Sequence, residues 1–211
     1  MLELRSEPDP LSTSRTGFLC ALAAAPTSMP RALCALGAYH QGLAEPFAEP
    51  RTHEERAGYH LFPVPDAVPG LLRQFMGTLV ELLENSDDAG DDALVAAFAA
   101  LATLLIHPFT DGNGRTAVDF AAFLLMKRGG LREPPFDHDG DTKGHLGLIA
   151  TLLVPKMTWF DRTNEWRTTR MVEEFLNNAS IEGLRGSDEI RAAAMALFGV
   201  RLDDGLCEER E

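Results

Sequence analysis

The sequence is short of basic residues. Its 211 residues include 19 Lys and Arg against 32 Asp and Glu, which gives a formal net charge of −13 at pH 7. A general nucleic-acid binder neutralises phosphates with clustered Lys and Arg. The charge balance therefore argues against a nucleic-acid partner, and any anionic ligand has to be held by a local binding device.

Cysteine is also scarce, and no ordinary secretion signal is visible. Cys20, Cys34 and Cys207 are odd in number and far apart, which is typical of reduced thiols rather than of a disulfide framework. The N-terminal "MLELRSEPDP" lacks the basic-then-apolar order of a signal peptide. We expect a cytoplasmic protein, or one that a specialised secretion system delivers into a host cell.

Apolar runs are too short to predict a membrane span. The longest covers residues 93–106 and is interrupted only by Thr103, whereas a spanning helix needs about 20 apolar residues. We therefore expect a buried helix and no membrane partner. The length and the 45% hydrophobic content favour one globular domain over residues 1–211.

Helical periodicity dominates the rest of the chain. The segment "LLRQFMGTLVELLE" is amphipathic, whereas "ALVAAFAALATLLI" and "TAVDFAAFLLM" are apolar almost all round and predict central helices. Asp91 and Asp92 stand where the first of these begins, as capping residues would. Residues 46–70 are dense in Pro and Gly and predict a hairpin or loop. The expected helices are 13–24, 29–43, 66–85, 91–106, 113–128, 142–153, 156–178 and 187–200, so the fold class is all-α.

The nine residues "HPFTDGNGR", 107–115, separate the two apolar segments. A loop there ends at a helix N-terminus, where backbone N–H groups lack helical partners and the dipole is positive. Gly112 and Gly114 allow close backbone approach to a ligand, and Arg115 adds a fork for phosphate oxygens. The pattern predicts an anion site.

The same loop carries an acid and a base. Asp111 can hold Mg²⁺, which prefers one or two carboxylates plus substrate phosphates. His107 can take a proton from an attacking hydroxyl, and we expect Phe109 to turn inward as an apolar anchor. These residue types suit phosphoryl or nucleotidyl transfer, although "DGNG" alone is also a common turn sequence without function.

The motif resembles the central sequence of the Fic (filamentation induced by cyclic AMP) branch of the Fic/Doc, or Fido, family, H-P-F-x-[D/E]-G-N-[G/K]-R, with every fixed position filled. Around it, "YHLFPVPDAVPGLLRQFMGTLVELLE" is similar to the family's stretch from its target-binding flap into the next helix. The likeness is clearest over residues 50–155. It implies a Fic-type helical bundle with a short β-hairpin flap, with N-terminal helices in residues 1–45 and C-terminal helices in residues 156–211.

The resemblance also implies a function, namely transfer of AMP or another nucleoside monophosphate from a nucleoside triphosphate such as ATP to a Ser, Thr or Tyr hydroxyl of a protein target. His107 would be the base, and Asp111 would hold Mg²⁺ or Mn²⁺. A flap within residues 51–62 would align the target by strand addition. The kinase-like Doc branch has Ala and Lys at positions 112 and 114, so this chain resembles the nucleotidyl-transferring members. The nucleotide-binding residues would be Gly112, Asn113, Gly114 and Arg115.

Two departures from the family pattern leave alternatives open. Val118 stands where many members carry a second arginine for the distal phosphate of ATP. No inhibitory [S/T]-x-x-x-E-[G/N] sequence is complete, because Thr16 replaces its Glu in "STSRTG" and "TRMVEE" ends on the wrong residue. The alternatives are another pyrophosphate-linked donor such as UTP or CDP-choline, removal of AMP, or a nucleotide-binding interaction module without catalysis.

Other polar and aromatic clusters carry weaker signals. The acids of "DHDGD", residues 137–141, alternate as in a Ca²⁺ loop, but Thr142 and Leu148 occupy the positions that need Gly and Glu. We therefore expect a polar turn there. Trp159, Phe160 and Trp166 have helical spacing and predict packing rather than a ligand site.

Overall fold

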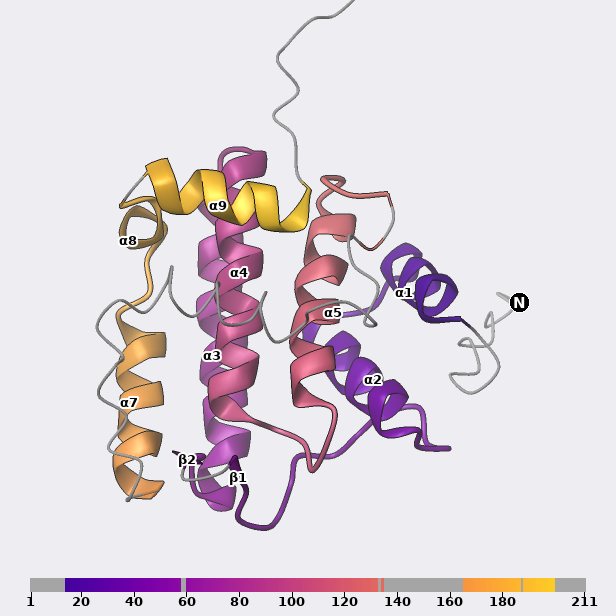
Figure 1. The fold of residues 1–211 in the computed structure, drawn as a ribbon, viewed down its shortest axis with the longest axis vertical. Coiled ribbons are helices and arrows are strands. Elements are labelled where there is room, and N and C mark those ends of the chain that lie inside the picture. The colour runs from indigo at the N-terminus through magenta and orange to yellow at the C-terminus, as the bar shows by residue number, and fades with distance from the viewer. Residues whose placement is uncertain (1–13, 58–59, 133, 135–164, 187, 200–211) are drawn as a thin grey trace, which may run out of the picture.

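The computed structural model describes residues 14–57, 60–132, 134, 165–186 and 188–199, and these form a helical bundle (Figure 1). The expected all-α class is confirmed. Two two-residue strands, β1 (Arg56–Ala57) and β2 (His60–Leu61), pair antiparallel. The helices are α1 (Arg15–Ala24), α2 (Met29–Gln41), α3 (Val68–Glu84, after a 3₁₀ turn at Pro65–Ala67), α4 (Ala89–Ile106), α5 (Asn113–Lys127), α7 (Glu165–Asn177), α8 (Ile181–Arg185) and α9 (Asp188–Phe198).

Helix α4 is the centre of the bundle. It packs against α3, α5, α7, α8 and α9, and almost all of its residues are buried. By length and composition alone α4 could cross a membrane, but 89% of it is buried inside the bundle. A helix that is apolar on every side and covered by neighbours is a core helix, as the sequence predicts.

Helix α3 covers one side of α4 with an amphipathic face. Its buried residues Leu71, Phe75, Leu79 and Leu82 recur every three or four positions, which is the spacing of one helix face. The Phe75 ring lies 6.2 Å from the ring of Phe98 on α4. The predicted orientation of this segment on the core surface is confirmed.

The start of α4 differs from the sequence prediction. Asp88, not Asp91 or Asp92, is the N-cap: its side chain accepts the N–H groups of Gly90 and Asp91 at 2.8 and 3.0 Å. Asp88 has extended backbone angles, as an N-cap requires. Asp91 and Asp92 lie in the first turn instead, where negative charge also favours the helix dipole.

Two further differences concern the C-terminal half. The five-residue helix α8, capped by the Ser180 side chain, is too short for periodicity to predict. The predicted helix 142–153, the "DHDGD" segment, the start of the predicted helix 156–178 and the side chain of Trp166 lie outside the described residues.

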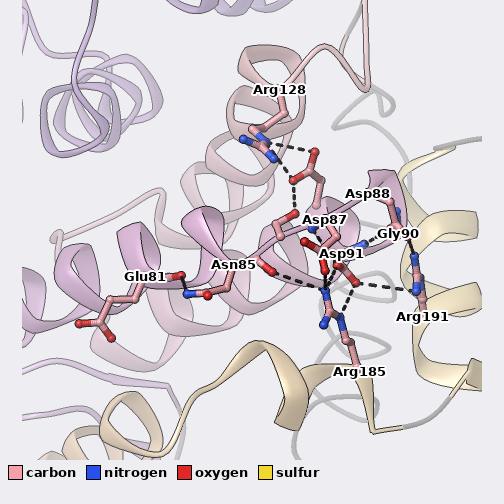
Figure 2. Close-up of polar contacts among 11 residues, drawn as sticks. Glu81, Asn85, Asp87, Asp88, Gly90, Asp91, Arg128, Arg185 and Arg191 are labelled. Atoms are coloured by element: carbon pink, nitrogen blue, oxygen red, sulfur yellow. Dashed lines mark hydrogen bonds and ion pairs between the residues drawn. The ribbon is translucent and has the colours of Figure 1, made fainter.

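Acidic side chains at the N-terminal end of α4 bind arginines from three other helices (Figure 2). Arg185 of α8 donates to Asp91 at 2.5 Å and to Asp87 at 2.7 Å. The hydrogen bond from Arg185 lowers the pKa of Asp91, against the opposing effect of burial. We call Asp87, Asp88, Asp91 and Asp92, with Arg128, Arg185 and Arg191, the α4 ionic cluster.

The remaining pairs of the α4 ionic cluster extend it to α5 and α9. Arg128, directly after α5, donates to both oxygens of Asp92 at 3.0 and 3.2 Å. Arg191 of α9 donates to Asp88. The cluster therefore fastens α5, α8 and α9 to one end of α4, whereas the hairpin and the loop of residues 107–112 lie at the opposite end (Figure 1).

Candidate active site

His107 ends α4 and begins the loop. Its N–H still donates to Thr103 O at 3.0 Å, but its φ of 50° is left-handed. Among the described residues it is the one non-glycine with positive φ, a conformation that is uncommon for such residues. Its ring lies flat against the ring of Phe62, with centroids 3.6 Å apart and planes 14° apart. Phe62 directly follows β2, so the His107 ring packs against the base of the hairpin.

Phe109 anchors the loop in the core, as predicted. Its ring is fully buried and packs so closely on Gly37 of α2 that a Cβ at position 37 would lie 2.6 Å from it. The Asn113 side chain closes the loop around this anchor, because Oδ1 accepts from Phe109 N at 2.9 Å and Nδ2 donates to Phe109 O at 2.7 Å. Both groups of the Asn113 side-chain amide therefore serve the shape of the loop.

Helix α5 begins without a side-chain cap. Gly112 is its N-cap in the left-handed conformation, φ 74°, and no side chain in the described part of the chain accepts its first N–H groups. A Cβ at position 112 would lie 2.8 Å from Cβ of His40, so both the conformation and the space require glycine. The first turn of α5, which contains Gly114 and Arg115, therefore presents N–H groups at the positive end of the helix.

Asp111 and Arg115 lie exposed beside this helix end. Their side chains are 79% and 46% exposed, and Arg115 Nη2 is 3.7 Å from Asp111 Oδ2. Asp111 Oδ1 accepts the N–H of Gly112 at 2.6 Å. An exposed pair of this kind contributes about 0–1 kcal/mol to stability, so the fold does not depend on it and both groups remain accessible to a ligand.

A metal ion at this loop would need more ligands than the described protein side chains supply. Within the described ranges, no group of three or more His, Cys, Asp and Glu side chains could hold an ion. One exposed carboxylate does fit Mg²⁺ that arrives with substrate phosphates, because Mg²⁺ is commonly bound by one or two carboxylates plus phosphate oxygens and water. Asp111 is the residue that could supply this carboxylate.

Comparison with known proteins relates the sequence of this region to a family. Residues 31–125, which run from α2 through the whole of the loop to near the end of α5, match the family model described as Fic/DOC family. These residues belong to the Fic/DOC family. No curated protein matches the chain significantly. Membership supports a Fic-type enzyme in general terms.

One similar solved structure is a Fic domain containing signaling protein from Bacteroides thetaiotaomicron VPI-5482. It is 14% identical to this chain with a TM-score of 0.48, and the match covers 90% of this chain and 77% of that chain.

The structure describes the positions at which the chain departs from the Fic pattern. Val118 is 3% exposed and packs in the core. Thr16 lies in the first turn of α1, which Ser14 caps. In "TRMVEE", the Thr169 hydroxyl accepts Val64 N–H at 3.1 Å, and Glu174 pairs with Arg170 on α7. Val118 and Thr169 therefore contribute to packing and to contacts between elements, whereas Thr16 is exposed and the Glu174–Arg170 pair lies within α7.

A buried ionic triad, Asp119 with Arg15 and His40, was not predicted from the sequence. It lies next to the loop of residues 107–112, which we call the Fic loop. Asp119 of α5 is fully buried; it accepts from Arg15 of α1 at 2.6 Å and lies 2.8 Å from His40 Nε2 of α2. His40 is the residue against which Gly112 packs. The triad therefore links α1 and α2 to α5, and His40 also contacts Gly112, the N-cap of α5. An acid within the apolar segment "TAVDFAAFLLM" is the signal that could have indicated a buried ion pair.

Proposed function

We propose that this protein is a Fic-type nucleotidyltransferase that moves AMP, or another nucleoside monophosphate, from a nucleoside triphosphate to a Ser, Thr or Tyr hydroxyl of a protein target. The observation that carries the proposal is the arrangement of the loop. His107 ends one buried helix, and the uncapped N-terminus of the next follows five residues later with Asp111 and Arg115 exposed beside it. A base, an anion site and a carboxylate thus share one short segment.

In this proposal the start of α5 holds the nucleotide. The N–H groups of Asn113, Gly114 and Arg115 would donate to phosphate oxygens, as helix N-termini do for anions. The Arg115 guanidinium would add a bidentate contact. Asp111 would hold Mg²⁺ or Mn²⁺ against the phosphates, and the bound ion would neutralise part of their charge.

His107 would act on the target. Its ring would take the proton of the target hydroxyl as the hydroxyl oxygen attacks the α-phosphorus. A bond forms between that oxygen and phosphorus, the bond from the α-phosphorus to the β-phosphate oxygen breaks, and pyrophosphate leaves. Stacking on Phe62 limits the rotation of the His107 ring, which favours one orientation for the proton transfer.

The β1–β2 pair is the candidate flap for the target segment. It lies at the end of the bundle that carries His107 (Figure 1), and Phe62 after β2 contacts the His107 ring. A two-stranded sheet has unpaired edges, and an extended peptide can add to such an edge through backbone hydrogen bonds. We propose that the target binds there.

Val118 favours a second candidate donor. The family's second arginine would grip the distal phosphate of ATP, and here a buried valine occupies its position. CDP-choline has no third phosphate to grip, so it suits this loop as well as ATP does, whereas UTP has the same distal phosphate as ATP and is not separated from ATP by Val118. From CDP-choline, attack at the phosphorus next to cytidine would transfer CMP and release phosphocholine, whereas attack at the phosphorus next to choline would transfer phosphocholine and release CMP.

Labelled donors distinguish these possibilities. The protein is incubated with a cell lysate and Mg²⁺ and, in turn, with ATP, GTP, CTP and UTP, each labelled either on the α-phosphate or on the γ-phosphate. A parallel series uses CDP-choline labelled on the phosphate next to choline or on the phosphate next to cytidine. Transfer of a nucleoside monophosphate labels a protein from an α-labelled triphosphate, whereas γ-labelled triphosphate leaves proteins unlabelled. Labelling from the γ-position would indicate phosphoryl transfer instead, and no labelling from any donor contradicts the proposal.

A further inference from the structure

Arg51 lies in the Pro-rich segment before the hairpin, and only 4% of it is exposed. Its guanidinium donates to three backbone carbonyls, which lie 2, 12 and 56 positions away: Nη1 to His53 O at 2.8 Å, Nη2 to Pro63 O at 2.7 Å and Nε to His107 O at 2.7 Å. One side chain therefore joins the end of α4 to both arms of the hairpin.

The contact with α4 is favourable for a cation. His107 is the C-cap of α4, and the carbonyls at this end of a helix carry the negative end of its dipole. The backbone of Arg51 makes a second contact, because its N–H donates to Pro108 O at 2.8 Å. Arg51 thus fixes two successive residues at the point where the Fic loop begins.

The contacts with the hairpin fix its base. His53 precedes β1 and Pro63 follows β2, and between them Phe62 N–H donates to Glu55 O at 3.2 Å. Phe62, next to Pro63, is the residue whose ring stacks on His107. Arg51 therefore binds the carbonyl of His107 directly. It also binds the carbonyl of Pro63, next to Phe62, and the Phe62 ring packs against the His107 ring.

We propose that Arg51 is a positioning residue that sets the orientation of the His107 ring relative to the hairpin. This inference rests on the proposed function, in which a target segment on the hairpin must bring its hydroxyl to His107. Arg51 acts through backbone carbonyls and Phe62. The N-terminus of α5 has a separate anchor in Phe109 and Asn113, so loss of Arg51 lowers the rate of transfer and leaves nucleotide affinity unchanged.

Three variants separate positioning from charge. Arg51→Met keeps the length of the side chain and removes all donors, whereas Arg51→Lys keeps the cation but cannot span three carbonyls as the planar guanidinium does. Arg73→Met is the matched control, because Arg73 is an exposed arginine of α3 outside the loop and the hairpin. Circular dichroism checks that each variant folds.

The first readout does not depend on activity. In NMR spectra of protein with isotope-labelled histidine, the His107 Cε1–H signal is identified by its loss in His107→Ala. Stacking on Phe62 shifts this signal upfield through the ring current. We expect the upfield shift to disappear in Arg51→Met, to be reduced in Arg51→Lys and to persist in Arg73→Met. If Arg51→Met does not fold, Arg51→Lys decides by the same comparison.

The second readout is the split between kcat and nucleotide affinity. We expect kcat to fall by about 10²-fold in Arg51→Met, the loss typical of a misplaced catalytic group, with unchanged nucleotide Kd and a smaller fall in Arg51→Lys. The inference is overturned if the His107 signal of a folded Arg51 variant stays at its wild-type position, or if its kcat equals that of the wild type. A joint loss of kcat and nucleotide affinity in a folded variant also overturns it. Absence of transfer in the wild type contradicts the proposed function instead, and the NMR comparison then decides on Arg51 alone.

Discussion

The two ends of helix α4 carry similar residues in opposite environments. At the N-terminal end, Asp91 is 1% exposed and is held by Arg185 of α8. At the C-terminal end, Asp111 is 79% exposed, and its nearest cation, Arg115, is 3.7 Å away. Removing one partner of a buried charge pair destabilises a fold strongly, whereas exposed and weakly paired charges contribute little to stability and remain available to a ligand. We therefore predict that substitutions at the first end change stability and that substitutions at the second end change ligand binding and transfer.

The largest expected effect is at the functional end. His107→Ala removes the proposed base, and loss of general-base catalysis typically costs about 10²–10⁴ in rate. We expect transfer to fall by that factor while nucleotide binding persists. The control is His53→Ala, which removes a half-exposed histidine of the hairpin segment. A His107→Ala protein with full activity would exclude the role assigned to this residue.

The next effect concerns the buried triad under the loop. Arg15→Met leaves the buried Asp119 with His40 but without its arginine, and breaking a buried ion pair typically costs about 3–5 kcal/mol. We expect the free energy of unfolding, measured with urea, to fall toward the lower part of that range because His40 remains. The exposed Arg115→Met is the control and should leave stability within about 0.5 kcal/mol.

The same triad bears on regulation. Deleting residues 1–24 removes Arg15 together with all of α1, so we expect reduced stability and no gain in the rate of transfer. A large gain in rate after this deletion would show that the N-terminal segment contains an inhibitory residue.

A smaller effect is expected at the structural end. Asp91→Asn keeps the shape of the side chain and the hydrogen bond from Asp87 N–H but removes the charge that binds Arg185. Hydrogen bonds to charged groups contribute about 1.5–3 kcal/mol, and we expect a loss of unfolding free energy in that range. Transfer measured well below the melting temperature should be unchanged. A folded Asp91→Asn protein that transfers slowly would contradict the separation of the two ends.

The smallest effect is the pH dependence of the unfolding free energy that Asp91→Asn loses. Because Arg185 lowers the pKa of Asp91 in the folded state, the carboxylate contributes its full stability above the unfolded pKa of about 3.9. The contribution decreases as the pH falls through the folded pKa. We expect the stability difference between wild type and Asp91→Asn to be constant from pH 7 to 5 and to narrow below pH 4 in urea titrations. A difference that widens in acid would mean that Asp91 is not the stabilising carboxylate.

The sequence predicted what depends on local pattern. Periodicity located the helices from α1 to α5 to within a few residues, and the motif located the loop and the inward Phe109. Sequence reasoning failed where distant residues meet. Asp119 contacts Arg15 and His40, which are 104 and 79 positions away, and Arg51 reaches His107 across 56 positions. Such pairs leave no periodic pattern in the sequence. The N-cap at Asp88 was missed because several aspartates lie close together there, and each of them could cap the helix.

The central claim is that nucleotide phosphates and their metal bind at the C-terminal end of α4 and not at the acidic N-terminal end. The same substitution at both ends tests it: Asp111→Asn and Asp91→Asn are compared with the wild type by the rise in Tm on adding each of ATP, GTP, CTP and UTP with Mg²⁺. A ligand at about 100 times its Kd adds roughly 2.7 kcal/mol to stability. We predict that at least one nucleotide raises the Tm of wild type and Asp91→Asn equally, and that Asp111→Asn loses the Mg²⁺-dependent part of the rise. An equal rise in all three proteins, or a loss in Asp91→Asn alone, would contradict the account.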